Sequence, residues 1–368
     1  MDSSQSGSRK RTKTGRESKT SSSTRRTSAY NPAFEQHLID HGIYKNNRTQ
    51  KPNNWAEINE RLARPRPSLS PSQFSEAAFE AFQQTNEDAL TENKVMSKAF
   101  PIIVGATNTP LQENLRFTNL QNLTDGSITN AQPDFYDGAR PEDLDQRIRE
   151  ELGPYIIPST NTATPCLPNF FMEGKGPNGP PDVSKLQAMY DGALGARGIH
   201  ELRSYVDSET AYDDNAHTIT STYHPSGLLT LYTTHAVKST NPNRQTDYRM
   251  TQLRSFAMTD APDTFRQGAT FFRNCRDLTR DERTKLIRAA NAKVVNAETS
   301  GFDSSTQSLV SPSSNEPIHL ESETSADELA MDSGILHTSS HIAPVLVGPS
   351  SPPMRSSRQW VKKGSKSK

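Results

Sequence analysis

Three side chains in the middle of the chain could together carry out chemistry. One is the aspartate of Pro133-Asp134, and two belong to the acid-x-lysine sequence Glu173-Gly174-Lys175. In a β-strand, residues i and i+2 face the same side, so Glu173 and Lys175 are predicted to share one cleft. Two carboxylates can hold a hard cation such as Mg²⁺, with the Gly174 carbonyl free near the metal. The pattern indicates metal-dependent phosphodiester hydrolysis, provided that the three side chains converge on a point open to solvent.

The context of the motif matters because acid-x-lysine is common. It also occurs at Glu17 and at Glu92. The copy at Glu173 alone ends an apolar segment, follows a Pro-Asp segment and precedes a segment with a helix start signal. A surface pair of Glu173 and Lys175 at the end of a strand is the alternative interpretation.

The elements that must position these residues are predicted to form a mixed α/β fold. Ser75 is a good N-cap, and the alternating β-branched residues on both sides of Pro225-Ser226-Gly227 predict a hairpin. Small residues around Gly192 and Gly195 would let a helix lie close against the sheet. Helices are predicted at 55–62, 75–99, 141–152, 182–197, 262–275 and 281–295, and strands at 101–104, 115–120, 131–136, 167–173, 217–223 and 228–234.

The composition indicates that the chain is not packed from end to end. Of its 368 residues only 32% are hydrophobic, and 42 basic side chains balance 42 acidic ones. We expect a disordered basic tail at 1–28, an N-terminal extension with short helices at 29–73, a catalytic-type domain at 74–293 and a disordered Ser/Thr/Pro-rich tail with a basic end at 294–368. The basic cluster at 9–13 fits a nuclear import signal, a phosphate-binding arm or a merely solubilising end.

Several classes of protein are excluded by the same arithmetic. The sequence contains no apolar run long enough for a membrane span and no apolar segment typical of a secretory signal. Two cysteines, Cys166 and Cys275, provide neither a disulfide framework nor a thiolate zinc cluster. We therefore expect an intracellular protein without membrane contact, in the nucleus or cytoplasm, with the nucleus slightly favoured by the basic cluster.

Long phrases of the central region carry a resemblance to a known family. They lie at 34–44, 54–58, 94–102, 133–139, 169–176 and 187–197. The Pro-Asp and Glu-x-Lys pattern looks like the restriction-endonuclease-like (PD-(D/E)xK) phosphodiesterase superfamily. More closely, residues 29–292 resemble a family of uncharacterised fungal proteins assigned to that superfamily. The resemblance implies a restriction-endonuclease-like mixed sheet flanked by helices.

The resemblance also implies roles for individual residues. Asp134, Glu173 and the carbonyl of Gly174 would bind Mg²⁺ or Mn²⁺, and Lys175 would be the catalytic lysine. Glu92 would supply an extra acid from the preceding helix, and Gln187 on the following helix would orient the substrate. That substrate would be nucleic acid, with DNA and RNA both open. Protein partners stay unknown.

Three departures from the superfamily pattern keep a second function open. The interval from Asp134 to Glu173 is long, the middle residue is Gly174, and Gln187 and Tyr190 are three apart where exonuclease-type members have four. The alternative is a catalytically inactive module of the same fold that binds nucleic acid or protein partners.

Histidines provide two weaker candidates for metal sites. His37 and His41 have the i, i+4 spacing of zinc ligands, but the sequence shows no third ligand, which favours a surface or packing role. His217, His224 and His235 lie on or near one predicted hairpin, where histidines at strand ends are common.

Overall fold

A computed structural model of the chain describes residues 26–45, 50–207 and 212–306. The basic cluster at 9–13 and the segment beyond residue 306, both parts of predicted tails, lie outside the described residues.

The centre of the fold is a mixed β-sheet. Within the described residues its strand order is β1-β7-β6-β5-β4-β3-β2. The pairs β1–β7 and β4–β5 are parallel, and the other neighbouring strands are antiparallel. The strands are β1 (Ile43–Lys45), β2 (Leu111–Glu113), β3 (Phe135–Ala139), β4 (Cys166–Gly174), β5 (Thr218–His224), β6 (Leu228–Lys238) and β7 (Thr246–Ala257).

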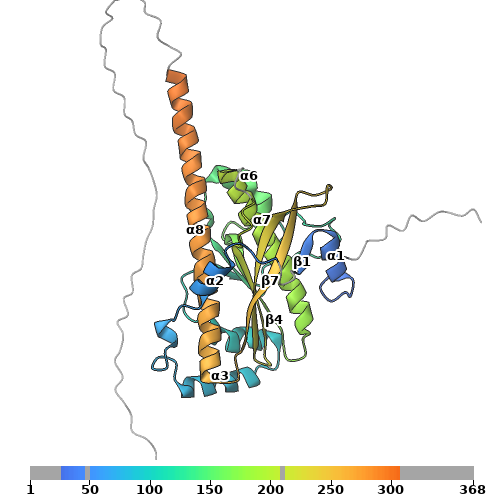
Figure 1. The fold of residues 1–368 in the computed structure, drawn as a ribbon, viewed down its shortest axis with the longest axis vertical. Helices are drawn as coiled ribbons and strands as arrows, with labels where there is room; N and C mark the ends of the chain where they lie inside the picture. The colour runs from blue at the N-terminus through green and yellow to red at the C-terminus, as the bar shows by residue number, and fades with distance from the viewer. Residues whose placement is uncertain (1–25, 46–49, 208–211, 307–368) are drawn as a thin grey trace, which may run out of the picture. The chain divides into compact units, whose positions relative to one another are not determined.

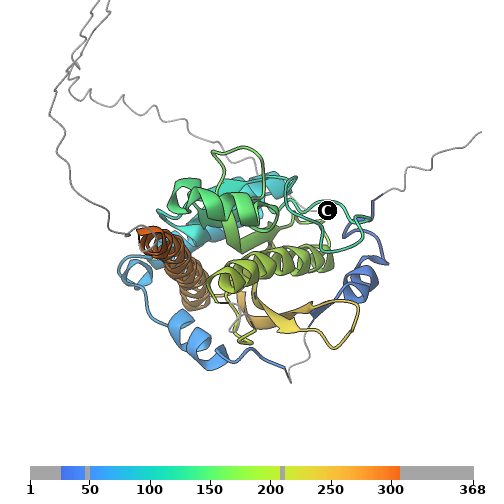
Figure 2. The same cartoon turned by 90° about the horizontal axis from the view of Figure 1, so that it is seen from above.

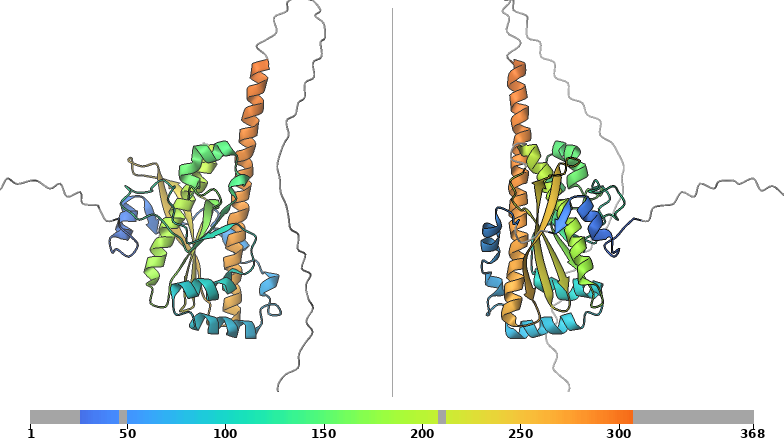
Figure 3. Two further views of the ribbon diagram at one scale, coloured as in Figure 1. Left: turned by 180° about the vertical axis from the view of Figure 1, so that it is seen from behind. Right: turned by 45° about the vertical axis from the view of Figure 1, so that its right-hand side comes forward.

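Helices cover both faces of this sheet. Figures 1 and 3 show the strands between α7 and the long helix α8, and Figure 2 shows α1 on the far side of the sheet from α8. The helices are α1 (Phe34–Asp40), α2 (Trp55–Leu62), α3 (Glu76–Glu87), α4 (Glu92–Lys94), α5 (Phe100–Val104), α6 (Gln146–Ile156), α7 (Pro181–Val206) and α8 (Pro262–Thr306), with a π-helical turn at Val95–Ala99 and 3₁₀ turns at Pro67–Leu69 and Pro141–Asp143. None of the described helices is both long and apolar enough to cross a membrane.

The alternation of side chains along β4 assigns its residues to the two faces. Phe170 and Met172 enter the apolar core beneath α8, whereas Phe171 enters the core beneath α7. All nine residues of β4 are buried. Glu173 has the parity of Phe171, so it is directed toward α7 although it carries a charge.

Glycines in α7 let this helix lie directly on the sheet. A Cβ atom at Gly192 would be 2.5 Å from Oγ1 of Thr234, and one at Gly195 would be 2.6 Å from the ring of Phe171. The prediction that small residues bring this helix close to the sheet is confirmed. The close approach sets the height of the neighbouring residue Asp191 above the strands.

The prediction of a mixed α/β sheet flanked by helices is confirmed, as are the helix at 55–62, the strand near 167–173 and the hairpin. The Ser75 side chain caps α3, where it accepts a hydrogen bond from the Ala78 amide at 3.3 Å. These elements carry strong local signals.

Several boundaries were wrong. Residues 101–104 form helix α5 rather than a strand, because a short apolar run fits a buried helix equally well. Residues 115–120 form no strand, and the strand β7 was missed. The two helices predicted at 262–275 and 281–295 are the single helix α8, and α7 continues beyond residue 197 to Val206.

Parts of both predicted tails lie among the described residues and form ordered structure. Helix α8 continues to Thr306, so residues 294–306 are helical. At the other end, the amide of Thr27 donates to the carbonyl of Ser127 at 2.6 Å, and the amide of Thr129 donates to Thr27 at 2.9 Å. The N-terminal extension contributes strand β1 to the sheet as well as short helices.

Candidate active site

The predicted residues meet where β3 begins and β4 ends. The antiparallel register pairs Phe135 with Met172, and the amide of Asp134 donates to the carbonyl of Met172 at 3.1 Å. The amide of Gly174 in turn donates to Oδ2 of Asp134 at 2.6 Å. Two residues that are far apart in the sequence are therefore fixed side by side by the ladder itself, and the long interval between them does not separate them.

Glu173 and Lys175 lie on the same side of the chain, as their i, i+2 spacing predicts. Nζ of Lys175 is 3.9 Å from Oε2 of Glu173, and each side chain is 2% exposed. The same Nζ donates to the carbonyl of Gly174 at 2.7 Å. This bond occupies one lone pair of the carbonyl that was predicted to face a metal.

Glu92 joins the cluster from the first turn of α4. Its Oε2 lies 3.6 Å from Nζ of Lys175, and its side chain is 45% exposed. The turn after β4 packs directly on this helix start, because a Cβ atom at Gly176 would be 2.8 Å from the Glu92 amide nitrogen. Lys175 therefore lies between a buried carboxylate and an exposed one.

A further acid, Asp191 of α7, joins the cluster and was not predicted. Its buried carboxyl group hydrogen-bonds Glu173, and its Oδ2 atom has no hydrogen-bond partner. Gln187 lies one turn earlier on the same helix, half-buried, and its Oε1 atom is also buried without a partner. The i, i+4 spacing of Gln187 and Asp191 was the signal that could have identified this residue.

Burial and crowding of these carboxyl groups raise their pKa values. Burial raises the pKa of Asp134 to about 6, against the opposing effects of the Gly174 amide and Lys175. Burial is also the main reason why the pKa of Asp191 rises to about 7. For Glu173, burial and the neighbouring charges of Asp191 and Asp134 hold the pKa well above its usual range. The cluster therefore contains more negative charge than Lys175 neutralises.

A groove leads from the surface to this cluster. Its volume is about 500 Å³, and its lining includes Glu92, Asp134 and Glu113 together with apolar side chains such as Met96 and Phe135. No lysine or arginine is among the described residues that line it. Asp134 and Glu92 face the opening, whereas Glu173 and Lys175 are buried behind them.

The donor set suits a hard divalent cation. Carboxylate oxygens are the ligands that Mg²⁺ prefers, and the buried Oδ2 of Asp191 has no hydrogen-bond partner that occupies it. In the arrangement described here, Lys175 separates the carboxylates of Glu92 and Glu173. Among the described residues, the one set of three candidate ligand atoms within 4.8 Å of one another lies elsewhere, at His37, His41 and Asp125.

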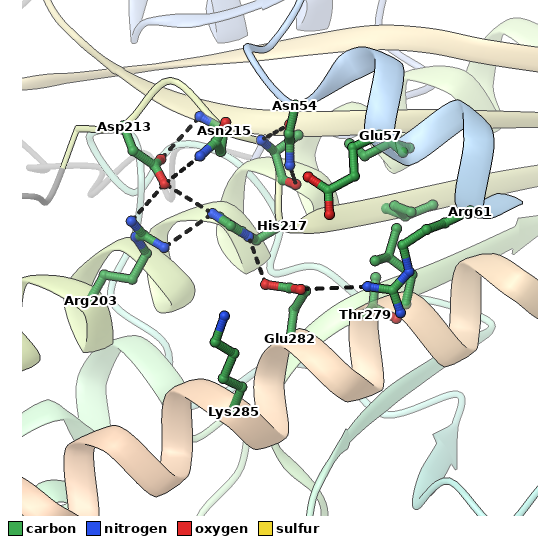
Figure 4. Close-up of a pocket in the computed structure, with 14 residues that line it drawn as sticks. Asn54, Glu57, Arg61, Arg203, Asp213, Asn215, His217, Thr279, Glu282 and Lys285 are labelled. Carbon is green, nitrogen blue, oxygen red and sulfur yellow. Dashed lines mark hydrogen bonds and ion pairs between the residues drawn. The ribbon is translucent and has the colours of Figure 1, made fainter.

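A second cavity, of about 240 Å³, lies between α2, α7, α8 and the start of β5. Figure 4 shows His217 between Asp213 and Glu282 on its wall. Nε2 of His217 is 3.3 Å from Asp213, and Nδ1 is 3.6 Å from Glu282. Arg203 is 2.6 Å from the same Asp213 carboxylate.

The charges around His217 compensate one another. Burial by itself would lower the pKa of His217, but its bonds to Asp213 and Glu282 raise it above the usual value. The bond to His217 lowers the pKa of Glu282. Because both ring nitrogens have carboxylate partners, this group ties α8 to the sheet rather than offering a free base. Within the described residues, His217, His224 and His235 form no metal cluster.

Comparisons with known proteins give one match. No curated protein and no solved structure matches the chain. The family model described as a domain of unknown function, DUF7924, matches residues 84–291, a segment that contains all of the acids and the lysine of the cluster. The chain belongs to the DUF7924 family.

Proposed function

We propose that this chain is a Mg²⁺- or Mn²⁺-dependent nuclease that hydrolyses phosphodiester bonds in nucleic acid. The proposal depends on one observation: Asp134, Glu173 and Lys175 converge at the adjoining ends of β3 and β4, beside an open groove. A mixed sheet with a helix layer on each face also agrees with a restriction-endonuclease-like fold, as the resemblance to the fungal family implies.

Each residue of the cluster has a distinct task in this reaction. When bound, the cation polarises the phosphodiester and lowers the pKa of a bound water. The carboxylates of Asp134 and Glu173 hold the cation, and Asp191 orients Glu173 through their hydrogen bond. The ammonium group of Lys175 offsets the charge that develops on the phosphoryl oxygens. Gln187, which lies on α7 with Asp191, would orient the substrate or a water.

The character of the groove supports a dependence on the cation. Glu92, Glu113 and Asp134 give its described lining a negative charge, which would repel a phosphate backbone. A divalent cation bound among these acids would remove that repulsion. Apolar side chains of the groove that are accessible, such as Leu111 and Val104, would then contact a base.

The burial of the lysine favours a second candidate function. Glu173 and Lys175 are each 2% exposed, and the Lys175 Nζ already donates to the Gly174 carbonyl. If this arrangement is permanent, the chain is an inactive nuclease-fold module that binds nucleic acid or a protein partner.

A cleavage assay with matched variants separates the two functions. The full chain is incubated with single- and double-stranded DNA and RNA, with Mg²⁺ or Mn²⁺ and with EDTA. We expect cation-dependent cleavage that falls at least ~100-fold in Asp134→Asn and in Lys175→Ala, the scale typical of acid–base and electrostatic groups. Glu113→Gln, an exposed acid of the same groove outside the cluster, is the control and should retain activity.

Two other results would contradict the nuclease proposal. Equal cleavage by wild type and both cluster variants would identify a contaminating enzyme. Nucleic-acid binding without cleavage under every cation condition would favour the inactive module.

A further inference from the structure

A second group of ligand-type side chains lies far from the proposed active site, at α1. One ligand atom from each of His37, His41 and Asp125 lies within 4.8 Å of the others. The sequence shows the two histidines at i, i+4, and the fold adds the third residue from a loop more than 80 positions later. The sequence favoured a packing role for the two histidines because it showed no third ligand. The structure provides a third candidate ligand, Asp125.

The distances in this group suit a tetrahedral metal. Nε2 of His37 and Oδ1 of Asp125 are 3.4 Å apart. Two ligands bound about 2.0–2.1 Å from a tetrahedral zinc ion are separated by about 3.4 Å. The imidazole rings of His37 and His41 are 4.5 Å apart, centre to centre.

Hydrogen bonds to the surrounding chain orient the ligand atoms. Nε2 of His37 lies 2.9 Å from the Ser127 hydroxyl, a contact that zinc would replace. Nδ1 of His41 bonds to the carbonyl of His37 at 2.8 Å, which leaves Nε2 with a free lone pair. A backbone carbonyl is a usual outer partner of a metal-binding histidine. Oδ1 of Asp125 accepts bonds from the amide of Ser127 at 3.0 Å and from its hydroxyl at 2.5 Å. These bonds fix the carboxylate so that it faces α1.

Both parts of the group have firm support in the fold. Phe34 and Leu38, on the other face of α1, are buried in the core beneath α7, and Phe34 packs edge-on against Tyr190. The loop of Asp125 is held by the backbone pairing of Thr27 with Ile128. The two histidines are half-buried and Asp125 is exposed, so an ion can enter from solvent.

We propose that His37, His41 and Asp125 form a zinc site that fastens the N-terminal segment to the loop around residue 125. Two imidazoles and one carboxylate are a zinc-type donor set, and they differ from the all-carboxylate cluster proposed to bind Mg²⁺. Water would complete the tetrahedron. The ion would hold α1 in place, together with the backbone pairing of Thr27. Helix α1 contacts α7, the helix that carries Asp191.

Zinc titration of the full chain after removal of metals tests the site. Isothermal titration calorimetry is performed on the Asp134→Asn chain, so that the other cluster does not contribute. We expect one equivalent of Zn²⁺ that Mg²⁺ does not displace. His37→Gln, His41→Gln and Asp125→Asn should each weaken binding at least ~10-fold. His224→Gln, whose ring bonds Ser226 in a distant turn, is the control and should bind as the parent does.

Hydrogen exchange gives a second measurement that does not depend on activity. The amides of Thr27 and Thr129 bond across the junction that the ion would fasten. At free Zn²⁺ of 100 times the dissociation constant, their exchange through local opening should slow up to ~100-fold, and Asp125→Asn should abolish this effect. A parent chain that binds no Zn²⁺, or ligand variants that bind it equally well, would overturn the proposal.

Discussion

Two aspartates only three positions apart, Asp134 just before β3 and Asp137 within it, have opposite surroundings. Asp137 faces α8, is fully buried, and receives two hydrogen bonds of 2.7 and 2.6 Å from the guanidinium of Arg276. Asp134 lies at the groove, and its charged neighbours include the carboxyl groups of Glu92, Glu173 and Asp191. The same short segment therefore holds a paired acid within β3 and a poorly compensated acid just before it.

The neighbouring strand β4 repeats the contrast. Asn169 donates to the carbonyls of His217 and Thr279 at 2.9 and 3.0 Å, and its Oδ1 accepts from the buried Arg283. Glu173, four residues later, has another acid, Asp191, as its hydrogen-bond partner. The polar contacts of β4 with α8 join groups that complement each other, whereas its contact with α7 joins two acids.

This difference distinguishes polar groups that stabilise the fold from polar groups that are candidates for a functional site. A buried acid without a cation costs free energy, and a sequence selected for stability alone would replace it. Groups of ionisable residues with shifted pKa values beside a groove are typical of functional sites. The cluster at Asp134, Glu173 and Asp191 has these properties, whereas the pair of Asp137 and Arg276 is explained by stability.

The largest expected effect is on the paired side. Asp137→Ala leaves the buried charge of Arg276 without its partner, so the free energy of unfolding should fall by about 3–5 kcal/mol. Chemical denaturation followed by circular dichroism measures this. The double variant Asp137→Leu with Arg276→Met removes both charges and should recover much of the loss. If Asp137→Ala costs less than about 1 kcal/mol, the pair does not hold α8 to the sheet.

On the unpaired side, removing a charge should stabilise the chain. The pKa of Asp191 is raised to about 7 in the folded chain, so the folded state binds more protons than the unfolded state between about pH 4 and 7. Stability is consequently lost as the pH rises through this window. Asp191→Asn removes this loss, and its advantage over wild type should grow from pH 5 to pH 7.5 by on the order of 2 kcal/mol.

The raised pKa of His217 also makes the chain lose stability as the pH rises above 6.5. This contribution is the same in Asp191→Asn and in wild type, so the difference in unfolding free energy between the two is the quantity to measure. Denaturation curves at several pH values provide it. Asp182→Asn, an exposed acid in the first turn of α7, is the control and should give a difference that does not vary with pH. A pH-independent difference for Asp191→Asn as well would show that the cluster is not strained by its charge.

The sequence predicted that Glu173 and Lys175 lie together because their i, i+2 spacing is a local feature. Glu173 and Lys175 end an apolar strand, and strand alternation alone places them on one side. The proximity of Asp134 came from the motif, and the register of β3 and β4 provides the physical reason. Helix α2 and the β5–β6 hairpin were predicted for the same reason, since their signals lie within about ten residues.

The features that were not predicted depend on contacts between segments that are far apart in the sequence. Asp191 enters the cluster because Gly192 and Gly195 bring α7 down onto the sheet, and no local pattern states which strand lies beneath it. Asp125 reaches His37 through the packing of a loop. The apolar run at α5 is helical because it continues the preceding turn of π-helix. Arg273 of α8 donates hydrogen bonds to the carbonyls of Ile102 and Ile103 near the end of α5.

The smallest expected effect concerns the glycine between the two key residues of β4. A Cβ atom at Gly174 would be 2.4 Å from Sδ of Met96 but 3.5 Å from Oδ2 of Asp134. The flexible thioether can move, so Gly174→Ala should cost about 1 kcal/mol, and this loss should disappear in a Met96→Ala background.

The matched change, next to the paired acid Asp137, is Gly138→Ala. There a Cβ atom would be 2.6 Å from the backbone oxygen of Cys166, which cannot move without disturbing the ladder, so the cost should be about 3 kcal/mol. Urea denaturation of both variants measures the difference. Equal losses at Gly174 and Gly138 would mean that the wall of the groove is as rigid as the contact between β3 and the start of β4, and that Met96 cannot move aside to open the way to Lys175.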